Sequence, residues 1–207
     1  MRIVSGMARG LCLKTVPGEG VRPTTDRVKE TLFAVLGDLT GSRVVDLFSG
    51  SGALGLEAFS RGAEQVVMVE QDPRHCRVIE ANLRHVQRAM PAGCVATARL
   101  VRGNAFQVRR LLPEWHADVD LVLADPPYED RPGLPTVDTW LTDPAFAAWA
   151  GTALLVLEHH TSSHFSWHPN GPWQRLKHRR FGTTTLSFAE VATPPVTAAA
   201  SGEPPVA

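Results

Sequence analysis

The sequence is short of the residues that mark several protein classes. Its three cysteines, Cys12, Cys76 and Cys94, are far apart and form no C-x-x-C pair, so we expect neither a disulfide framework nor a metal site. No apolar run approaches the roughly 18 residues of a membrane span, and the first residues lack the apolar core of a signal peptide. These absences favour a soluble, cytoplasmic protein with free thiols and no membrane association.

An excess of charge of one sign is also missing. The 207 residues include 21 Lys plus Arg and 21 Asp plus Glu, which gives a formal net charge of +0. Overall composition therefore does not indicate nucleic-acid binding, and any basic surface must be local. The length and the hydrophobic fraction of 43% suit one globular domain with a small appendage.

From residue 43 onward, apolar runs of strand length alternate with helical patterns. The expected strands cover 43–48, 65–70, 98–102, 119–124 and 152–158, and the expected helices cover 54–61, 73–86, 105–112 and 136–150. The last of these helices contains Asp143-Pro144, where a break is expected. Repeated β-α units of this length predict an α/β fold with a parallel sheet and helices on both faces. All strand carboxyl ends should then lie along one edge.

The two ends of the chain depart from this alternation. Residues 1–40 predict a small hairpin with glycine-assisted turns, followed by a helix that ends at Gly37. Two β-rich runs, 173–180 and 183–191, are too close for a helix between them and predict an antiparallel hairpin at the sheet edge.

We therefore expect three segments in the chain. The first is an N-terminal hairpin and helix extension, residues 1–40, and the second is the α/β domain, residues 41–191. The third, residues 192–207, contains mainly Ala, Pro, Thr, Ser and Gly and is expected to be a disordered tail.

One predicted strand stops at an unusual sequence, Asp125-Pro126-Pro127-Tyr128. Proline has no N–H, so this strand end presents only acceptors: the Asp125 carboxylate and nearby carbonyls. Tyr128, the only tyrosine in the chain, adds a flat aromatic face. Acceptors beside a stacking surface suit the exocyclic amine of a planar base. The alternative is a tight loop that merely ends a strand.

A glycine-rich turn follows the first strand of the α/β domain. Gly50-Ser-Gly-Ala-Leu-Gly55 matches G-x-G-x-x-G, which by itself would also suit a dinucleotide enzyme. Asp46, inside the preceding strand, instead favours a ligand that carries an amine or a cation over a pyrophosphate. For Asp46 alone, the alternative is a carboxylate that caps a helix or lies on the surface.

Two further strand ends complete this pattern. Glu70 ends the second strand, where a carboxylate can accept both hydroxyls of a ribose, and Asn104 follows the third, where an amide can pair with an adenine edge. A sulfonium nucleoside with an amino-acid tail, S-adenosylmethionine, satisfies all these groups. The expected cofactor residues are Asp46, Phe48, Gly50, Gly52, Glu70, Asn104 and Ala105.

Three motifs occur in the order and spacing of one known family. They are Arg22–Phe33 (RPTTDRVKETLF), Asp46–Ala63 (DLFSGSGALGLEAFSRGA) and Asp125–Tyr128 (DPPY). Over roughly residues 1–191 the chain resembles the RsmD family, the bacterial small-subunit ribosomal RNA guanine-N2 methyltransferases. Ser49 stands where that family often has Ala, and Asn104 stands where Asp is frequent.

The resemblance implies a Rossmann-like class I methyltransferase fold with a mostly parallel seven-stranded sheet. It implies transfer of a methyl group from S-adenosylmethionine to N2 of one guanine in 16S ribosomal RNA, guanine 966 in the family. The expected partner is the small subunit or a late assembly intermediate, and we expect a monomer. The implied catalytic group is Asp125–Tyr128, and the implied RNA contacts are Arg9, Arg22, Thr24 and Arg27.

Other functions remain open at this point. Related Pro-Pro-Tyr motifs also serve methyltransferases that act on adenine N6 or on a glutamine side chain. A non-catalytic RNA-binding assembly protein and a dinucleotide oxidoreductase are further alternatives. The basic run from Arg175 to Arg180 indicates either an additional RNA contact or a solvated edge strand protected by charge.

Overall fold

The computed structural model describes residues 1–16, 26–127, 136–163, 165, 167 and 171–192. The strands are β1 (Arg43–Leu47), β2 (Gln65–Glu70), β3 (Thr97–Arg102), β4 (Leu121–Ala124), β5 (Leu154–His160), β6 (Trp173–Phe181) and β7 (Thr184–Val191). The α-helices are α1 (Asp26–Leu36), α2 (Ala53–Ser60), α3 (Pro73–Ala89), α4 (Val108–Leu111), α5 (Val137–Leu141) and α6 (Pro144–Ala150). Two short 3-10 turns, η1 (Ala105–Gln107) and η2 (Pro113–Trp115), flank α4.

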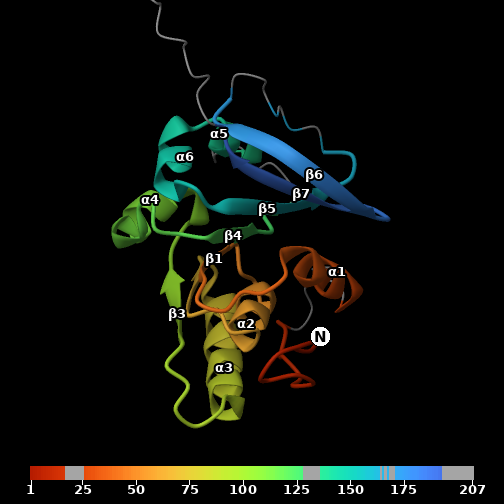
Figure 1. The fold of residues 1–207 in the computed structure, drawn as a ribbon, viewed down its shortest axis with the longest axis vertical. Coiled ribbons are helices and arrows are strands. Elements are labelled where there is room, and N and C mark those ends of the chain that lie inside the picture. Colours follow the sequence, from red (N-terminus) through yellow and green to blue (C-terminus); the bar gives the residue numbers. More distant parts are fainter. Residues whose placement is uncertain (17–25, 128–135, 164, 166, 168–170, 193–207) are drawn as a thin grey trace, which may run out of the picture.

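The strands form one seven-stranded sheet in the order β3-β2-β1-β4-β5-β7-β6 (Figure 1). The first five strands in this order are mutually parallel, whereas β7 is antiparallel to both β5 and β6. The carboxyl ends of β1 to β5 therefore lie along one edge, as predicted. The antiparallel hairpin predicted for the end of the domain is also confirmed, with β6 as the outermost strand.

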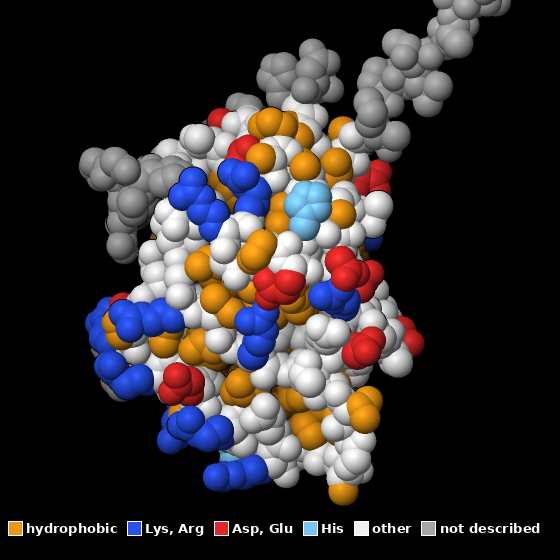
Figure 2. Space-filling view, turned by 90° about the vertical axis from the view of Figure 1, so that its left-hand side faces the viewer, with side chains coloured by type: hydrophobic (Ala, Val, Ile, Leu, Met, Phe, Trp, Pro, Cys, Tyr) orange, Lys and Arg blue, Asp and Glu red, His pale blue; other side chains and the backbone are white. Residues whose placement is uncertain are grey.

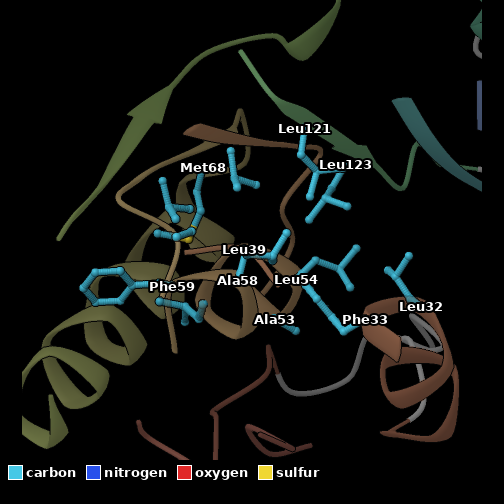
Figure 3. Packing of buried hydrophobic residues seen from close by; sticks show 14 of the residues in the cluster. Leu32, Phe33, Leu39, Ala53, Leu54, Ala58, Phe59, Met68, Leu121 and Leu123 are labelled. Atoms are coloured by element: carbon cyan, nitrogen blue, oxygen red, sulfur yellow. The ribbon is translucent and has the colours of Figure 1, made fainter. Parts of the chain in front are cut away.

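Helices cover both faces of the sheet because alternate strand residues are apolar on each side. On one face, Val44, Met68 and Leu123 pack with residues of α1, α2 and α3. Figure 3 shows this cluster, in which side chains of α1, α2, β2 and β4 meet. On the other face, Leu47 and Leu155 pack with residues of α4, α5 and α6. We call these the α2 face and the α6 face.

The predicted element boundaries are met closely, with two informative differences. The helix expected over 136–150 is two helices, because the Asp143 side chain accepts a hydrogen bond from the Ala145 N–H at 2.9 Å and Pro144 starts α6. The N-terminal hairpin is short: its one antiparallel bridge pairs Arg2 with Cys12, and backbone hydrogen bonds from the Ile3 N–H to the Leu11 carbonyl and from the Leu13 N–H to the Met1 carbonyl flank it. In the described part of the chain, no helix is long and apolar enough to cross a membrane.

Candidate active site at the carboxyl edge of the sheet

The residues predicted to act together lie at neighbouring strand ends. Backbone hydrogen bonds hold these ends in register: the Ser49 N–H donates to the Val69 carbonyl at 3.1 Å, and the Gly103 N–H to the Glu70 carbonyl at 2.9 Å. The Asp125 N–H lies 3.4 Å from the Leu47 carbonyl. The structure thus gathers the predicted cofactor residues and Asp125 at one edge of the sheet, on rigid strand termini.

The turn after β1 bends sharply and lies close to the sheet. Phe48, Gly50 and Gly52 have φ angles of 58°, 57° and 78°, a region that strains every residue except glycine. The space is also tight, because a Cβ on Gly55 would lie 2.7 Å from Met68 Cγ and 3.0 Å from Asp46 Oδ2. The glycines therefore let α2 begin directly against the sheet. Phe48 is not a glycine, so its positive φ angle is strained, and such strain is common in functional turns.

Asp46 is almost completely buried beneath this turn. Its Oδ2 accepts a hydrogen bond from the Gly55 N–H, in the first turn of α2, at 2.9 Å. Burial raises the pKa of the Asp46 carboxyl to about 7, and the nearby Glu70 adds to this, while the Gly55 bond opposes it. Asp46 therefore does bind the first turn of α2, as the helix-capping alternative for this residue predicts. The carboxyl is also poised to gain charge when a cation approaches.

This raised pKa makes the stability of the protein depend on pH. The folded state retains the Asp46 proton between the ordinary pKa of 3.8 and about 7, so this group destabilises the fold increasingly as pH rises through that window. Asp46→Asn should match wild type near pH 4 and become more stable than wild type by a few kcal/mol, as an order of magnitude, near pH 8. Denaturant titrations at both pH values measure the difference. A stability gap that does not grow with pH would contradict the assignment.

Glu70 ties the glycine turn to the end of β2. Its Oε2 accepts from the Gly50 N–H at 2.9 Å, and its Oε1 accepts from the N–H groups of Gln71 and Asp72 at 2.7 and 2.8 Å. A carboxylate oxygen can accept more than one hydrogen bond, so these contacts fix its orientation and leave it able to accept hydroxyls.

Asn104 lies just beyond β3 and begins η1. Its Oδ1 accepts a hydrogen bond from the Phe106 N–H at 3.0 Å, which leaves the amide NH₂ free of partners within the described part of the chain. The neighbouring wall is aromatic: Phe48 meets Phe106 edge to face with ring centroids 5.0 Å apart, and Trp140 with centroids 6.2 Å apart. An amide donor beside an apolar wall is the environment expected for a nucleobase.

Asp125 stands directly after β4, half-buried, with Pro126 buried and Pro127 exposed. Burial raises the pKa of the Asp125 carboxyl well above its ordinary value, and Glu158 and then Asp46 raise it further. Tyr128 lies outside the described residues.

Glu158 is a residue of this edge that the sequence interpretation did not assign. β4 and β5 pair Ala124 with Leu157, so Asp125 and Glu158 follow side by side on adjacent strands. Glu158 is buried, and its charge acts on Asp125. The sequence does show Glu158 as a carboxylate near the end of a predicted strand. Its position beside Asp125, however, depends on the strand order of the folded sheet.

The residues expected to contact RNA are only partly described. Arg9 and Arg27 are exposed, the first in the turn that follows Gly6 and the second in the first turn of α1. Arg22 and Thr24 lie outside the described residues. The structure therefore places Arg9 and Arg27 at the surface and does not test their role.

Comparison with known proteins identifies the family. The family model described as conserved hypothetical protein 95 matches residues 1–190. The chain belongs to this family. It is 36% identical over 151 residues to the ribosomal RNA small subunit methyltransferase D of Escherichia coli K12, covering 70% of this chain and 71% of that protein. The protein of the same name from Haemophilus influenzae is 34% identical over 129 residues, covering 62% of this chain and 64% of that protein.

Solved structures of similar sequence have the same fold. The yhhF protein from Escherichia coli superposes with a TM-score of 0.71 and 31% identity, covering 92% of this chain and 97% of that one. A hypothetical protein from Thermus thermophilus gives a TM-score of 0.68 and 32% identity, covering 92% and 99%. The resemblance to the RsmD family and the class I methyltransferase fold are confirmed, and with them the expected methyl donor, S-adenosylmethionine.

Proposed function

We propose that this member of the conserved hypothetical protein 95 family transfers a methyl group from S-adenosylmethionine to the exocyclic N2 of a guanine in the small-subunit ribosomal RNA. The observation that carries the proposal is Asp125-Pro126-Pro127 at the end of β4, directly beside the glycine turn of β1. A carboxylate flanked by two prolines offers acceptors and no N–H at the place where the base would lie. The named relative at 36% identity supports ribosomal RNA as the substrate.

The chain's own groups fit the cofactor. Glu70 is held by three backbone N–H groups, so both oxygens are oriented and can accept ribose hydroxyls. Asp46 has a raised pKa that a bound amine would lower, and the glycines allow close approach of a ligand to the backbone. S-adenosylmethionine supplies a methyl group already activated by its sulfonium, so the protein mainly has to position the two reactants.

The difficult reactant is the base, because the N2 lone pair is delocalised into the guanine ring. In our proposal, Asp125 and the Pro126 carbonyl accept the two N2 hydrogens and so direct the lone pair toward the methyl group. As the N–C bond forms and the C–S bond breaks, Asp125 stabilises the positive charge that develops on N2. The methylated nitrogen then loses one proton to water. Tyr128 would stack on the base and hold it out of its neighbours' stack.

Asp125 must be ionised to stabilise the positive charge that develops on N2, so activity should depend on pH. Because burial and Glu158 raise the Asp125 pKa, methyl transfer should fall as the pH is lowered through that pKa. Glu158→Gln removes the neighbouring charge and should move the falling limb to lower pH. The measurement is the rate against pH at saturating RNA and cofactor. An unshifted profile in the variant would argue against a charge interaction between the two groups.

The other substrates of Pro-Pro-Tyr methyltransferases provide the test of this proposal. Radiolabelled S-adenosylmethionine is offered with four acceptors: unmodified small subunits, naked 16S ribosomal RNA, duplex DNA and a peptide release factor. The release factor is included because a release factor glutamine methyltransferase from Bifidobacterium longum is 32% identical over 161 residues. We expect label in ribosomal RNA, from the subunits, the naked RNA or both. Label confined to DNA or to the release factor would replace the proposal with one of the alternatives.

A further inference from the structure

Basic side chains collect on β6, although the chain as a whole is electrically balanced. On the face that Figure 2 shows, Lys and Arg side chains form small groups among acidic and apolar ones. β6 differs, because 4 of the chain's 21 Lys and Arg, namely Arg175, Lys177, Arg179 and Arg180, occur within its nine residues. The strand contains no acidic residue, and all four basic side chains are exposed. This is the kind of local basic surface that net charge conceals.

Within the described residues, no carboxylate neutralises the four cations through an ion pair. Their recorded contacts are few. Arg175 lies over the Trp167 ring at 5.9 Å and Lys177 over the Phe188 ring at 5.0 Å, and the Arg180 Nε donates to the Gly182 carbonyl at 3.3 Å. Charged side chains also protect an edge strand from pairing with another chain, but four cations without an acidic residue among them form a local basic surface that suits a polyanionic partner.

The strand register divides the four cations between the two faces of the sheet. Lys177 pairs with Phe188 and Arg179 with Leu186, and both partners belong to the core of the α2 face. Directly paired residues share a face, so Lys177 and Arg179 project on the α2 face. Arg175 pairs with Ala189, which belongs to the core of the α6 face, and Arg180 pairs with Thr185. Because Thr185 alternates with Leu186, Arg175 and Arg180 project on the α6 face.

The acceptor site lies on the same face as Lys177 and Arg179. Leu123 and Val156 are in the α2-face core, so two residues further on Asp125 and Glu158 project on that face too. Glu158 pairs with Leu186, which pairs with Arg179. Asp125 and Arg179 are therefore three strand steps apart on one face of the sheet, about 14 Å at the strand spacing of roughly 4.8 Å, with the buried Glu158 and Leu186 between them. That reach suits phosphates of nucleotides that flank the target base.

We infer that Lys177 and Arg179 on β6 bind the phosphate backbone of the substrate RNA beside the acceptor site, whereas Arg175 and Arg180 do not. The inference rests on the proposed RNA substrate and adds a binding surface that the three sequence motifs do not contain. Phosphate contacts fix the position and register of the nucleic acid and carry no sequence information. These two residues should therefore affect RNA affinity and leave the chemical step unchanged.

The two faces of β6 provide a matched experiment. Two double variants change the same number of charges on this strand, but on opposite faces. The first pair is Lys177→Glu/Arg179→Glu, and the second pair is Arg175→Glu/Arg180→Glu. RNA affinity is measured over a range of salt, together with kcat and KM for methyl transfer. For the first pair we expect KM to rise about 10-fold or more, kcat to stay constant, and the slope of log affinity against log salt to weaken by about 1 or more. For the second pair, KM and RNA affinity should stay within about 2-fold of the wild-type values, as expected for cations that make no phosphate contact.

Two results would overturn the inference. One is an equal loss of RNA affinity in both pairs, which would indicate general electrostatic attraction, and the other is unchanged RNA affinity in the first pair. Lys177→Gln/Arg179→Gln, with its melting temperature compared with wild type, separates a binding defect from a folding defect. The wild-type enzyme is the control for the proposed function itself. If it methylates ribosomal RNA and the Lys177/Arg179 pair has no effect, only this inference fails. If it methylates no RNA, the proposed function fails first.

Discussion

Replacing Asp125 with alanine is expected to reduce methyl transfer by at least about 100-fold, the range seen when a preorganised electrostatic partner of a transition state is removed. The physical reason is that Asp125 would hold an N2 hydrogen and stabilise the charge that develops on N2. Binding of S-adenosylmethionine should remain nearly intact, since the expected cofactor groups lie on β1, β2 and after β3. Single-turnover rates and calorimetric titration of the cofactor measure the two effects separately.

Glu64→Ala is the matched control for this experiment. Glu64 is an exposed carboxylate directly before β2, at the opposite edge of the sheet, and we expect its variant to behave as wild type. Asp125→Asn is less informative, because the amide oxygen still accepts a hydrogen bond. Near-normal turnover in Asp125→Ala would remove Asp125 from the mechanism.

Replacing Glu57 with alanine is expected to cost about 3 kcal/mol of stability, as is typical when one partner of a buried ion pair is lost. Glu57 is fully buried and lies 3.8 Å from the Nζ of Lys29, which is also fully buried. Its carboxylate accepts hydrogen bonds from the N–H groups of Val4 and Ser5 at 2.8 and 3.0 Å, which fastens the N-terminal segment to α2. Denaturant unfolding measures the loss, and hydrogen exchange at Val4 and Ser5 should accelerate.

Glu80→Ala is the control, since Glu80 is an exposed glutamate on α3 and its removal should change stability by less than about 0.5 kcal/mol. A similar, small change in Glu57→Ala would mean that Lys29 is sufficiently stabilised by its other contacts. Those contacts are a hydrogen bond to the Arg2 carbonyl and an ion pair with Asp26 at 3.7 Å.

The sheet could be predicted because its central strands β1, β2, β4 and β5 are apolar on both faces, so local pattern and global fold agree. The pattern even indicated the break at Asp143-Pro144, where Asp143 caps α6 and Pro144 is its first residue, while α5 ends before them at Leu141. The positions of Glu70, Asn104 and Asp125 followed from one rule, that the ends of parallel strands share an edge.

The parts that could not be predicted depend on contacts between distant residues. The two N-terminal arms bond to each other around Arg2 and Cys12, where the Ile3 N–H donates to the Leu11 carbonyl at 2.9 Å. The segment is also fixed by distant side chains, because the Ala8 N–H donates to Ser60 Oγ at 2.9 Å and the Lys14 N–H to Asn82 Oδ1 at 2.8 Å. These partners are 52 and 68 residues away, beyond any local pattern. Glu158 was missed for a related reason, since β5 lies beside β4 only through the strand order of the folded sheet.

Identification of the methylated nucleoside tests the central claim most directly. Small subunits from cells that lack the modification are incubated with the protein and S-adenosylmethionine, and the RNA is digested to nucleosides for mass spectrometry. Our account predicts N2-methylguanosine at one site, formed by wild type and Glu64→Ala and absent with Asp125→Ala. N6-methyladenosine as the product, or N2-methylguanosine formed equally by Asp125→Ala, would contradict it.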